Sequence, residues 1–205
     1  MKKLLMVFVL VGIIGAGTAF ADYPDGFGIG LRGGYGLGGL VAFGEGDWNW
    51  SGGATRHFLI SAGGGGLTLK FPKLPIFWGI NFSYLSYWFV LGLTFDYYFI
   101  HNQIGNIPLH WYFGIGGYFD FGIGRKDIWG DRWGHRINGG VRLPIGLALM
   151  FKFGGRLEAL ELNLGVAPSI GVGYIFKDSP SYLYDKGNFA LHWGVPIEFG
   201  IRFWF

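Results

Sequence analysis

The sequence predicts an all-β protein, an eight-stranded antiparallel up-and-down transmembrane β-barrel preceded by a cleavable signal peptide. Three observations predict this fold class: a secretory-type N-terminus, long segments of alternating polarity, and a composition unusual for a soluble domain. Aromatic residues make up 20% of the chain, 40 residues are glycine and only 14% are charged. This composition favours strands in an apolar medium over a helical bundle.

The N-terminal segment indicates secretion. Lys2 and Lys3 form a positive region, residues 4–16 are apolar apart from glycine, and Ala19-Phe20-Ala21 fits the small-x-small cleavage pattern. The apolar run is shorter than the ~20 residues of a membrane-spanning helix, although an N-terminal anchor helix is the alternative. We assign residues 1–21 to a signal peptide and 22–205 to one β-barrel domain.

The charge and cysteine content exclude several classes. The full chain has 16 basic and 13 acidic residues, so removal of Lys2 and Lys3 leaves 14 against 13. No basic block remains, which argues against a nucleic-acid partner. The chain has no cysteine, so it forms no disulfide or thiolate metal site. We expect no metal and no cofactor.

Alternation with a period of two predicts the strands. Residues 189–205 are the clearest case, because large apolar residues occupy every second position from Phe189 to Phe205. The charge-free run 75–95 also fits the hydropathy of a transmembrane helix, but its period is two rather than 3.6. Seven further segments alternate, the weakest being 67–71: residues 27–37, 67–71, 78–85, 89–99, 109–121, 141–152 and 160–174.

The charges in these segments lie on the face opposite the large apolar residues. A soluble sandwich would turn its apolar face inward in short strands, whereas long strands after a secretory signal favour an apolar face turned to lipid. A closed barrel is then required, because the bilayer core cannot solvate a free strand edge. Short connections at 72–75, 101–107 and 153–157 alternate with longer polar ones at about 42–56, 123–138 and 177–187, and the hairpin near 84–88 is short.

The final segment, "IEFGIRFWF", carries a resemblance to a known family. With the signal peptide and eight alternating strands, it resembles the small outer-membrane β-barrels of diderm bacteria, which include the OmpA transmembrane domain and the OmpX and OmpW families. The resemblance implies a location in the outer membrane, in contact with its lipid. It also implies that Phe203 and Phe205 belong to the signal read by the barrel-assembly machinery.

The polar faces of the strands are expected to fill the barrel lumen. Buried charges must be paired or they cost several kcal/mol each, so a packed ion-pair network that plugs the lumen is expected. A proton or small-solute path gated by the same pairs is the alternative, and His110 and His192 also face inward. The expected network contains Arg32, Lys70, Asp96, Asp120, Arg142, Lys152, Glu161, Glu198 and Arg202.

The connections expected outside the cell offer the candidate binding residues. Arginine and tryptophan are enriched at interface hot spots, and both recur in "RKDIWGDRWGHR". This segment is a candidate site for an extracellular protein or glycan, although its tryptophans, like Trp48 and Trp50, also fit an interfacial aromatic belt. The candidate residues are Arg125, Lys126, Trp129, Arg132, Trp133 and Arg136.

Catalytic candidates are few. Ser179, His57 and His135 lie in expected outer connections, where a lipid A-modifying enzyme would hold its serine and histidine, but no catalytic spacing links them. We therefore expect no enzyme activity. The expected protein is a monomer with a structural or surface-interaction (adhesin-like) role, and a narrow channel for small or apolar solutes is the alternative.

The N-terminal part of the barrel contains Gly28-x-Gly30-x-x-Gly33, which matches a dinucleotide-binding fingerprint. That fingerprint needs a preceding strand and a following helix, whereas here the residues after it continue to alternate. Gly28, Gly30, Gly34 and Gly36 share a face with Arg32, so the glycines are interpreted as small residues that make room for this arginine and an acidic partner in the lumen.

Overall fold

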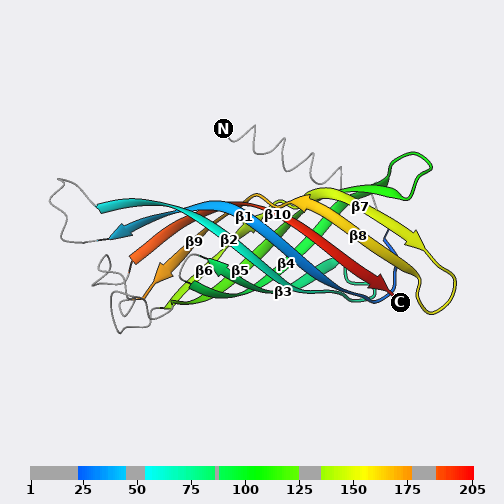
Figure 1. The fold of residues 1–205 in the computed structure, drawn as a ribbon, viewed down its shortest axis with the longest axis horizontal. Coiled ribbons are helices and arrows are strands. Elements are labelled where there is room, and N and C mark those ends of the chain that lie inside the picture. Colours follow the sequence, from blue (N-terminus) through cyan, green and yellow to red (C-terminus); the bar gives the residue numbers. More distant parts are fainter. Residues whose placement is uncertain (1–22, 45–53, 86–87, 125–134, 177–187) are drawn as a thin grey trace.

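The computed structural model describes residues 23–44, 54–85, 88–124, 135–176 and 188–205, and this part of the chain forms one antiparallel sheet (Figure 1). This confirms the all-β antiparallel part of the sequence prediction. Within the run 75–95, residues 76–85 and 88–95 form strands rather than the alternative helix, and among the described residues no helix is long and apolar enough to cross a membrane. The strands are β1 Gly28–Gly44, β2 Ala54–Lys70, β3 Ile76–Leu85, β4 Trp88–Gln103, β5 Leu109–Gly124, β6 His135–Arg142, β7 Ile145–Lys152, β8 Ala159–Val166, β9 Ser169–Ile175 and β10 Asn188–Trp204.

The sheet closes on itself through its first and last strands. On one side β1 pairs with β2, from Gly28–Lys70 to Gly44–Ala54. On the other side it pairs with β10, from Gly28–Trp204 to Phe43–Phe189. β1 therefore has a neighbour on each side and presents no free edge. Figure 1 shows the strands running obliquely around an elongated cylinder.

The two ends of the cylinder differ in their connections. Residues 71–75, 104–108 and 153–158 join strands at the end where the C-terminus lies, which we call the turn end. At this end the backbone of Phe27 and Phe205 exchanges two hydrogen bonds of 2.7 and 2.8 Å. The opposite end, where β1 stops and β2 starts, is called the loop end.

At two places round the closed sheet, two short strands follow one another where a single long strand would lie. β6 and β7 pair with successive parts of β5, and β9 and β8 pair with successive parts of β10. Alternation predicts unbroken strands at 141–152 and 160–174, but this is wrong, because residues 143–144 and 167–168 are not in a strand. Pro144 and Pro168 fall in these gaps, because proline has no N–H to donate to a neighbouring strand.

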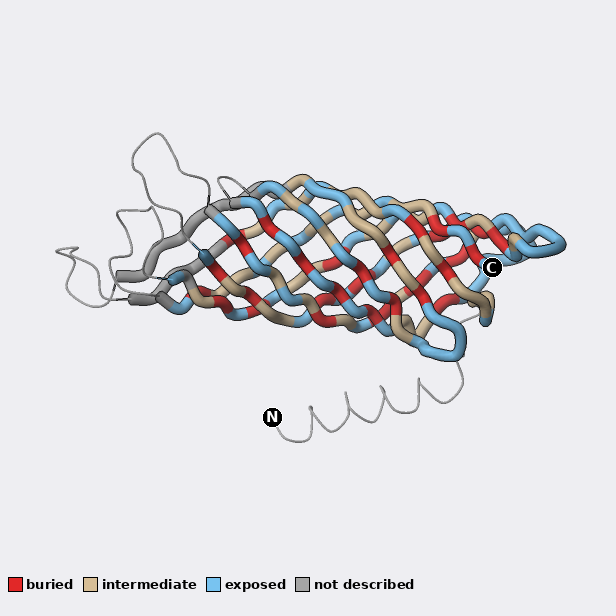
Figure 2. The backbone as a smooth tube through the Cα atoms, turned by 90° about the horizontal axis from the view of Figure 1, so that it is seen from below, coloured by how far each residue is buried: buried red, intermediate tan, exposed pale blue. Residues whose placement is uncertain are grey.

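Buried and exposed residues alternate along the strands (Figure 2). The exposed face carries large apolar side chains throughout, with Leu31 63%, Val172 64% and Phe199 60% exposed. The face turned to the interior carries polar and charged side chains, among them Asp96 and Arg202, which are 2% and 5% exposed. The interior of this sheet is thus more polar than its outside.

Several boundaries differ from those expected. β2 extends over 54–70, although the run Gly63–Gly66 obscured all of it except 67–71 in the sequence pattern. β1 reaches Gly44 and β6 begins at His135, so both expected loops, 42–56 and 123–138, are shorter than predicted. Arg136, assigned to the second of these loops, is a buried strand residue.

Candidate functional site

The interior of the closed sheet holds the polar groups that are candidates for function. Between the two ends of the cylinder, two arginines and two carboxylates form a ring, which we call the charge ring. Glu198 Oε2 accepts a hydrogen bond from Arg142 Nη2 at 2.6 Å and one from Arg32 Nη1 at 3.4 Å. Asp96 lies 3.1 Å from Arg142 Nε and 3.9 Å from Arg32 Nη1. The four groups carry equal numbers of positive and negative charges, which is what a buried charge cluster requires.

Neutral groups complete the contacts of Arg32. Its Nη2 donates to Asn81 Oδ1 at 2.5 Å and to Thr94 Oγ1 at 2.8 Å. Asn81 is on β3 and Thr94 is on β4, so Arg32 links β1 to two strands that do not pair with it. A Cβ on Gly79 would lie 2.7 Å from Arg32 Nη2, so this glycine leaves the space that the guanidinium occupies.

A second charge cluster lies nearer the turn end. Arg202 Nη1 is 2.9 Å from both carboxylate oxygens of Glu161, which also accepts hydrogen bonds from Trp204 Nε1 at 3.0 Å and Asn163 Nδ2 at 3.1 Å. The guanidinium of Arg202 also lies 4.6 Å from the ring centre of Phe77, within the range of a cation–π contact. Glu161 is therefore held by three donors.

An aromatic cluster fills the lumen at the turn end. Tyr23, which precedes β1, stacks on His101 with ring centres 3.6 Å apart, and His101 stacks on His110 at 4.7 Å. Tyr23 also contacts Phe77 at 4.8 Å and Trp204 at 5.7 Å. Burial, and then the nearby Glu161 carboxylate, raise the pKa of the Tyr23 phenol well above its ordinary value, so it stays a neutral hydroxyl. The chain immediately before β1 thus closes this end.

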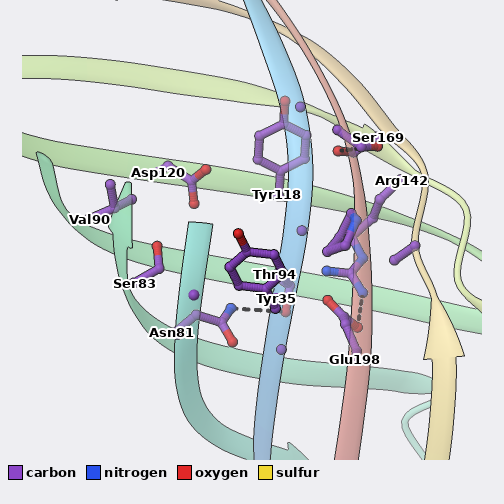
Figure 3. Close-up of a pocket in the computed structure, with 18 of the residues that line it drawn as sticks. Tyr35, Asn81, Ser83, Val90, Thr94, Tyr118, Asp120, Arg142, Ser169 and Glu198 are labelled. Carbon is purple, nitrogen blue, oxygen red and sulfur yellow. Dashed lines mark hydrogen bonds and ion pairs between the residues drawn. The ribbon is translucent and has the colours of Figure 1, made fainter. Parts of the chain in front are cut away.

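The loop-end half of the lumen is open by comparison. A cavity of about 250 Å³ lies on the loop-end side of the charge ring, and side chains from several strands point into it (Figure 3). A smaller space of about 20 Å³ lies on the turn-end side of the charge ring, between the two charge clusters. The lumen is therefore packed toward the turn end and hollow toward the loop end.

The structure brings together six of the nine residues expected in the lumen network, in the two clusters described above: Arg32, Asp96, Arg142, Glu161, Glu198 and Arg202. Lys70 is also buried, but its Nζ donates to the carbonyl of Phe71 and lies 5.9 Å from the Phe77 ring centre. Asp120 lines the loop-end cavity, and so do Arg136 and His192.

Two expected placements are corrected. Lys152 is exposed rather than in the lumen network, because β7 ends at this residue and carries its side chain past the packed interior. Arg136 is 2% exposed in β6 and lines the cavity instead of belonging to an external loop. Arg125, Lys126, Trp129, Arg132 and Trp133 lie outside the described residues, as do Trp48, Trp50 and Ser179; the side chain of His57 is not described. His135 is exposed at the start of β6, and Phe203 and Phe205 are outward-facing residues at the turn end.

Sequence reasoning missed His101 and Tyr23. The pairing register shifts between Tyr98 and Ile100, so a β-bulge changes the phase of alternation and turns His101 inward. A strict period of two continued from Asp96 would have placed His101 outside. Tyr23 had no sequence signal at all, because it lies outside any alternating segment.

Among the described residues, no group of three or more His, Cys, Asp or Glu side chains could hold a metal ion. What the arrangement provides is fixed hydrogen-bonding and ionic groups, and a cavity above them.

Comparisons with known proteins find similarity among solved structures. No family model matches the chain, and no curated protein matches it. Among solved structures it is similar to the crystal structure of Neisserial surface protein A, at 12% identity and a TM-score of 0.41, over 87% of this chain and 97% of that one.

Proposed function

We propose that this chain is an integral outer-membrane β-barrel protein, made as a precursor with a cleaved signal peptide, whose lumen is closed and whose role is structural or one of surface interaction. The observation that carries the proposal is the reversed polarity of the closed sheet. Large apolar side chains cover its outside, while Asp96, Glu161 and Arg202 are buried inside. A soluble protein does not cover a closed sheet with exposed phenylalanine, leucine and tryptophan, whereas a bilayer favours this arrangement.

The strand count supports a small barrel. If β6 with β7, and β9 with β8, are each taken as one interrupted crossing, the ten strands make eight crossings, each long enough to span a bilayer when tilted. A barrel of this size has an interior that side chains can fill. A closed sheet also satisfies the backbone groups that a bilayer cannot solvate.

The two charge clusters and the aromatic cluster support a closed lumen. Any conducting path would have to pass the ring of Arg32, Asp96, Arg142 and Glu198 and then the stacked Tyr23 and His101 rings. Separating these charges without replacing their partners costs several kcal/mol. We therefore favour the surface role over the channel, with the loop end facing outward because the N- and C-terminal strand ends lie at the turn end.

The test has two arms. Folded protein should migrate differently on a gel with and without boiling, and should partition with lipid vesicles; a protein that stays soluble and shows no gel shift would overturn the membrane assignment. In planar bilayers we expect no stable open state. A reproducible conductance would overturn the closed lumen while leaving the membrane assignment intact, and would favour the channel.

A further inference from the structure

The cavity in the loop-end half of the lumen has the properties of a ligand site. It encloses about 250 Å³ and is lined by residues of β1, β2, β3, β4, β5, β6, β9 and β10. Water occupies about 30 Å³ per molecule in the liquid, so the space would hold roughly eight waters or one small organic molecule. Its floor is the ring of arginines and carboxylates, so a ligand can enter from the loop end and go no further.

Among the described residues, the charges around the cavity are balanced. Arg32 and Arg142 in the floor face Asp96 and Glu198 at 2.6 to 3.9 Å. Nearer the loop end, the cavity lining adds one acidic side chain, Asp120, and one basic side chain, Arg136. A charged ligand would have to displace an existing pairing or bring an unpaired charge into a buried site, which is costly. The occupant favoured by this balance is neutral.

One wall of the cavity carries no side chains. Gly34, Gly36 and Gly38 of β1 line it, and a Cβ on Gly34 would lie 2.8 Å from the Ile197 carbonyl oxygen, while one on Gly36 would lie 2.7 Å from the Cα of Pro196. Close approach of β10 thus accounts for these glycines without any ligand. Their consequence is a smooth backbone surface against which a ring can lie.

Other parts of the lining present polar atoms without partners. Asn138, on β6, is only 3% exposed, and among the described residues its Oδ1 has no hydrogen-bond partner; the same holds for His192 Nε2 on β10. Both residues line the cavity. A buried polar atom without a partner costs about 1–3 kcal/mol, so these atoms favour an occupant that supplies hydrogen bonds. Tyr118, Ser83 and Ser169 add hydroxyl groups around the same space (Figure 3).

We propose that the loop-end half of the lumen binds one neutral polyhydroxylated molecule of the size of a single hexose. A hydroxyl group both donates and accepts, so one sugar can satisfy Asn138 Oδ1 as a donor and His192 Nε2 in either tautomer. Neutrality fits the balanced charges, and a sugar ring can lie against the glycine wall. The site lies inside the sheet, so it does not depend on the bilayer assignment.

The test uses the full mature chain folded in a detergent without a sugar headgroup. Saturation-transfer NMR is recorded with D-glucose, D-galactose and D-mannose, with the charged analogues glucuronate and glucosamine, and with the trisaccharide maltotriose. We expect binding of at least one neutral hexose with a dissociation constant tighter than about 10 mM, and weaker binding of both charged analogues.

Three variants locate the site. Asn138→Leu removes the unpartnered oxygen without breaking a described hydrogen bond, so it should fold and weaken binding at least tenfold. Ser83→Phe fills the cavity and should abolish binding. Asn102→Leu, an exposed amide at the turn end of β4, is the matched control and should leave binding unchanged.

Each result decides the proposal. No binding of a neutral hexose, a preference for a charged analogue, or binding unaffected by Asn138→Leu and Ser83→Phe would each overturn it. Asn138-dependent binding of maltotriose would support it and identify the source as the terminal unit of a glycan, and Asn138-dependent binding of the monosaccharides alone would support a free sugar. Gel-shift behaviour on boiling is measured on every variant, so that loss of folding is distinguished from loss of binding.

Discussion

Removal of the Glu198 charge is the sharpest test of whether the balanced charges in the lumen stabilise the fold. Glu198 Oε2 accepts from Arg142 at 2.6 Å and from Arg32 at 3.4 Å, and the Glu198 side chain is 19% exposed. Glu198→Gln leaves two guanidinium groups facing the single carboxylate of Asp96. Breaking a buried ion pair by removing one partner typically costs about 3–5 kcal/mol, and the partial exposure of Glu198 places the expected loss of unfolding free energy near the lower limit.

A double variant distinguishes the effect of charge balance on stability from the effect of lost contacts. Arg142→Met alone leaves Asp96 and Glu198 to share Arg32, so it should also cost about 3–5 kcal/mol. With Arg142→Met and Glu198→Gln together, Arg32 and Asp96 remain as one pair, 3.9 Å apart. The combined loss should then be smaller than the sum of the single losses by about 1–3 kcal/mol, which is the range of coupling energies for residues in contact.

The assay is equilibrium unfolding in urea of protein folded in lipid vesicles, followed by tryptophan fluorescence and checked by the gel shift. Lys152→Met is the matched control, because this cation is exposed and should change stability by less than about 0.5 kcal/mol. Single losses that add to the double loss within about 0.5 kcal/mol would refute the balanced ring.

Three further outcomes are expected from the same measurements. Leu164→Arg, at a side chain 57% exposed on the outer face, should cost about 2–4 kcal/mol near the bilayer midplane; no loss in vesicles would contradict a lipid-facing position. Tyr23→Ala should cost about 2–3 kcal/mol, below the ~3–5 kcal/mol of a fully buried aromatic side chain, because Tyr23 is partly buried; Tyr23→Phe keeps the stacking on His101 and should cost much less. Gly30→Leu should lose folded yield because its Cβ would collide with the Ile201 carbonyl, while Gly154→Ala, with nothing within 4 Å, should fold normally; normal folding of Gly30→Leu would refute the close approach of β1 and β10.

Alternation along the strands was enough to predict the fold class and the inward face. Residues such as Asp96, Glu161 and Arg202 sit opposite large apolar neighbours in the sequence, and a period of two carries each of them to the interior. The same reasoning failed where another constraint changed the period or ended the strand. Pro144 and Pro168 interrupt two strands, the bulge after Tyr98 turns His101 inward, and the end of β7 leaves Lys152 exposed.

The pairing of particular charges could not be predicted in the same way. Arg142 and Glu198 are far apart in sequence and lie on strands that are not neighbours in the sheet, because β9 lies between β6 and β10. Their contact depends on the radius of the closed sheet and on which strand faces which across the lumen. The loop-end cavity likewise depends on closure, since it exists only where the glycines of β1 face the polar side chains of β5 and β6.

Three prolines weaken the hydrogen bonding of the sheet close to the charge ring. Pro144, Pro168 and Pro196 accept hydrogen bonds from Gly114, Leu143 and Ala167, at 2.9, 2.9 and 3.0 Å, but none of them can return the second bond of its pair. Three ladder bonds are therefore missing along one level of the wall, from β5 round to β10, where the bilayer of the proposed location would offer no compensating donor. Arg142 immediately precedes this level and Glu198 lies two residues beyond Pro196, so their 2.6 Å contact joins β6 to β10 across the weakened strands. The 3.1 Å contact of Arg142 with Asp96 joins the same level to β4. The buried charges thus contribute a cross-lumen connection where the sheet has lost its own, which gives the ring a structural role even with the cavity above it empty.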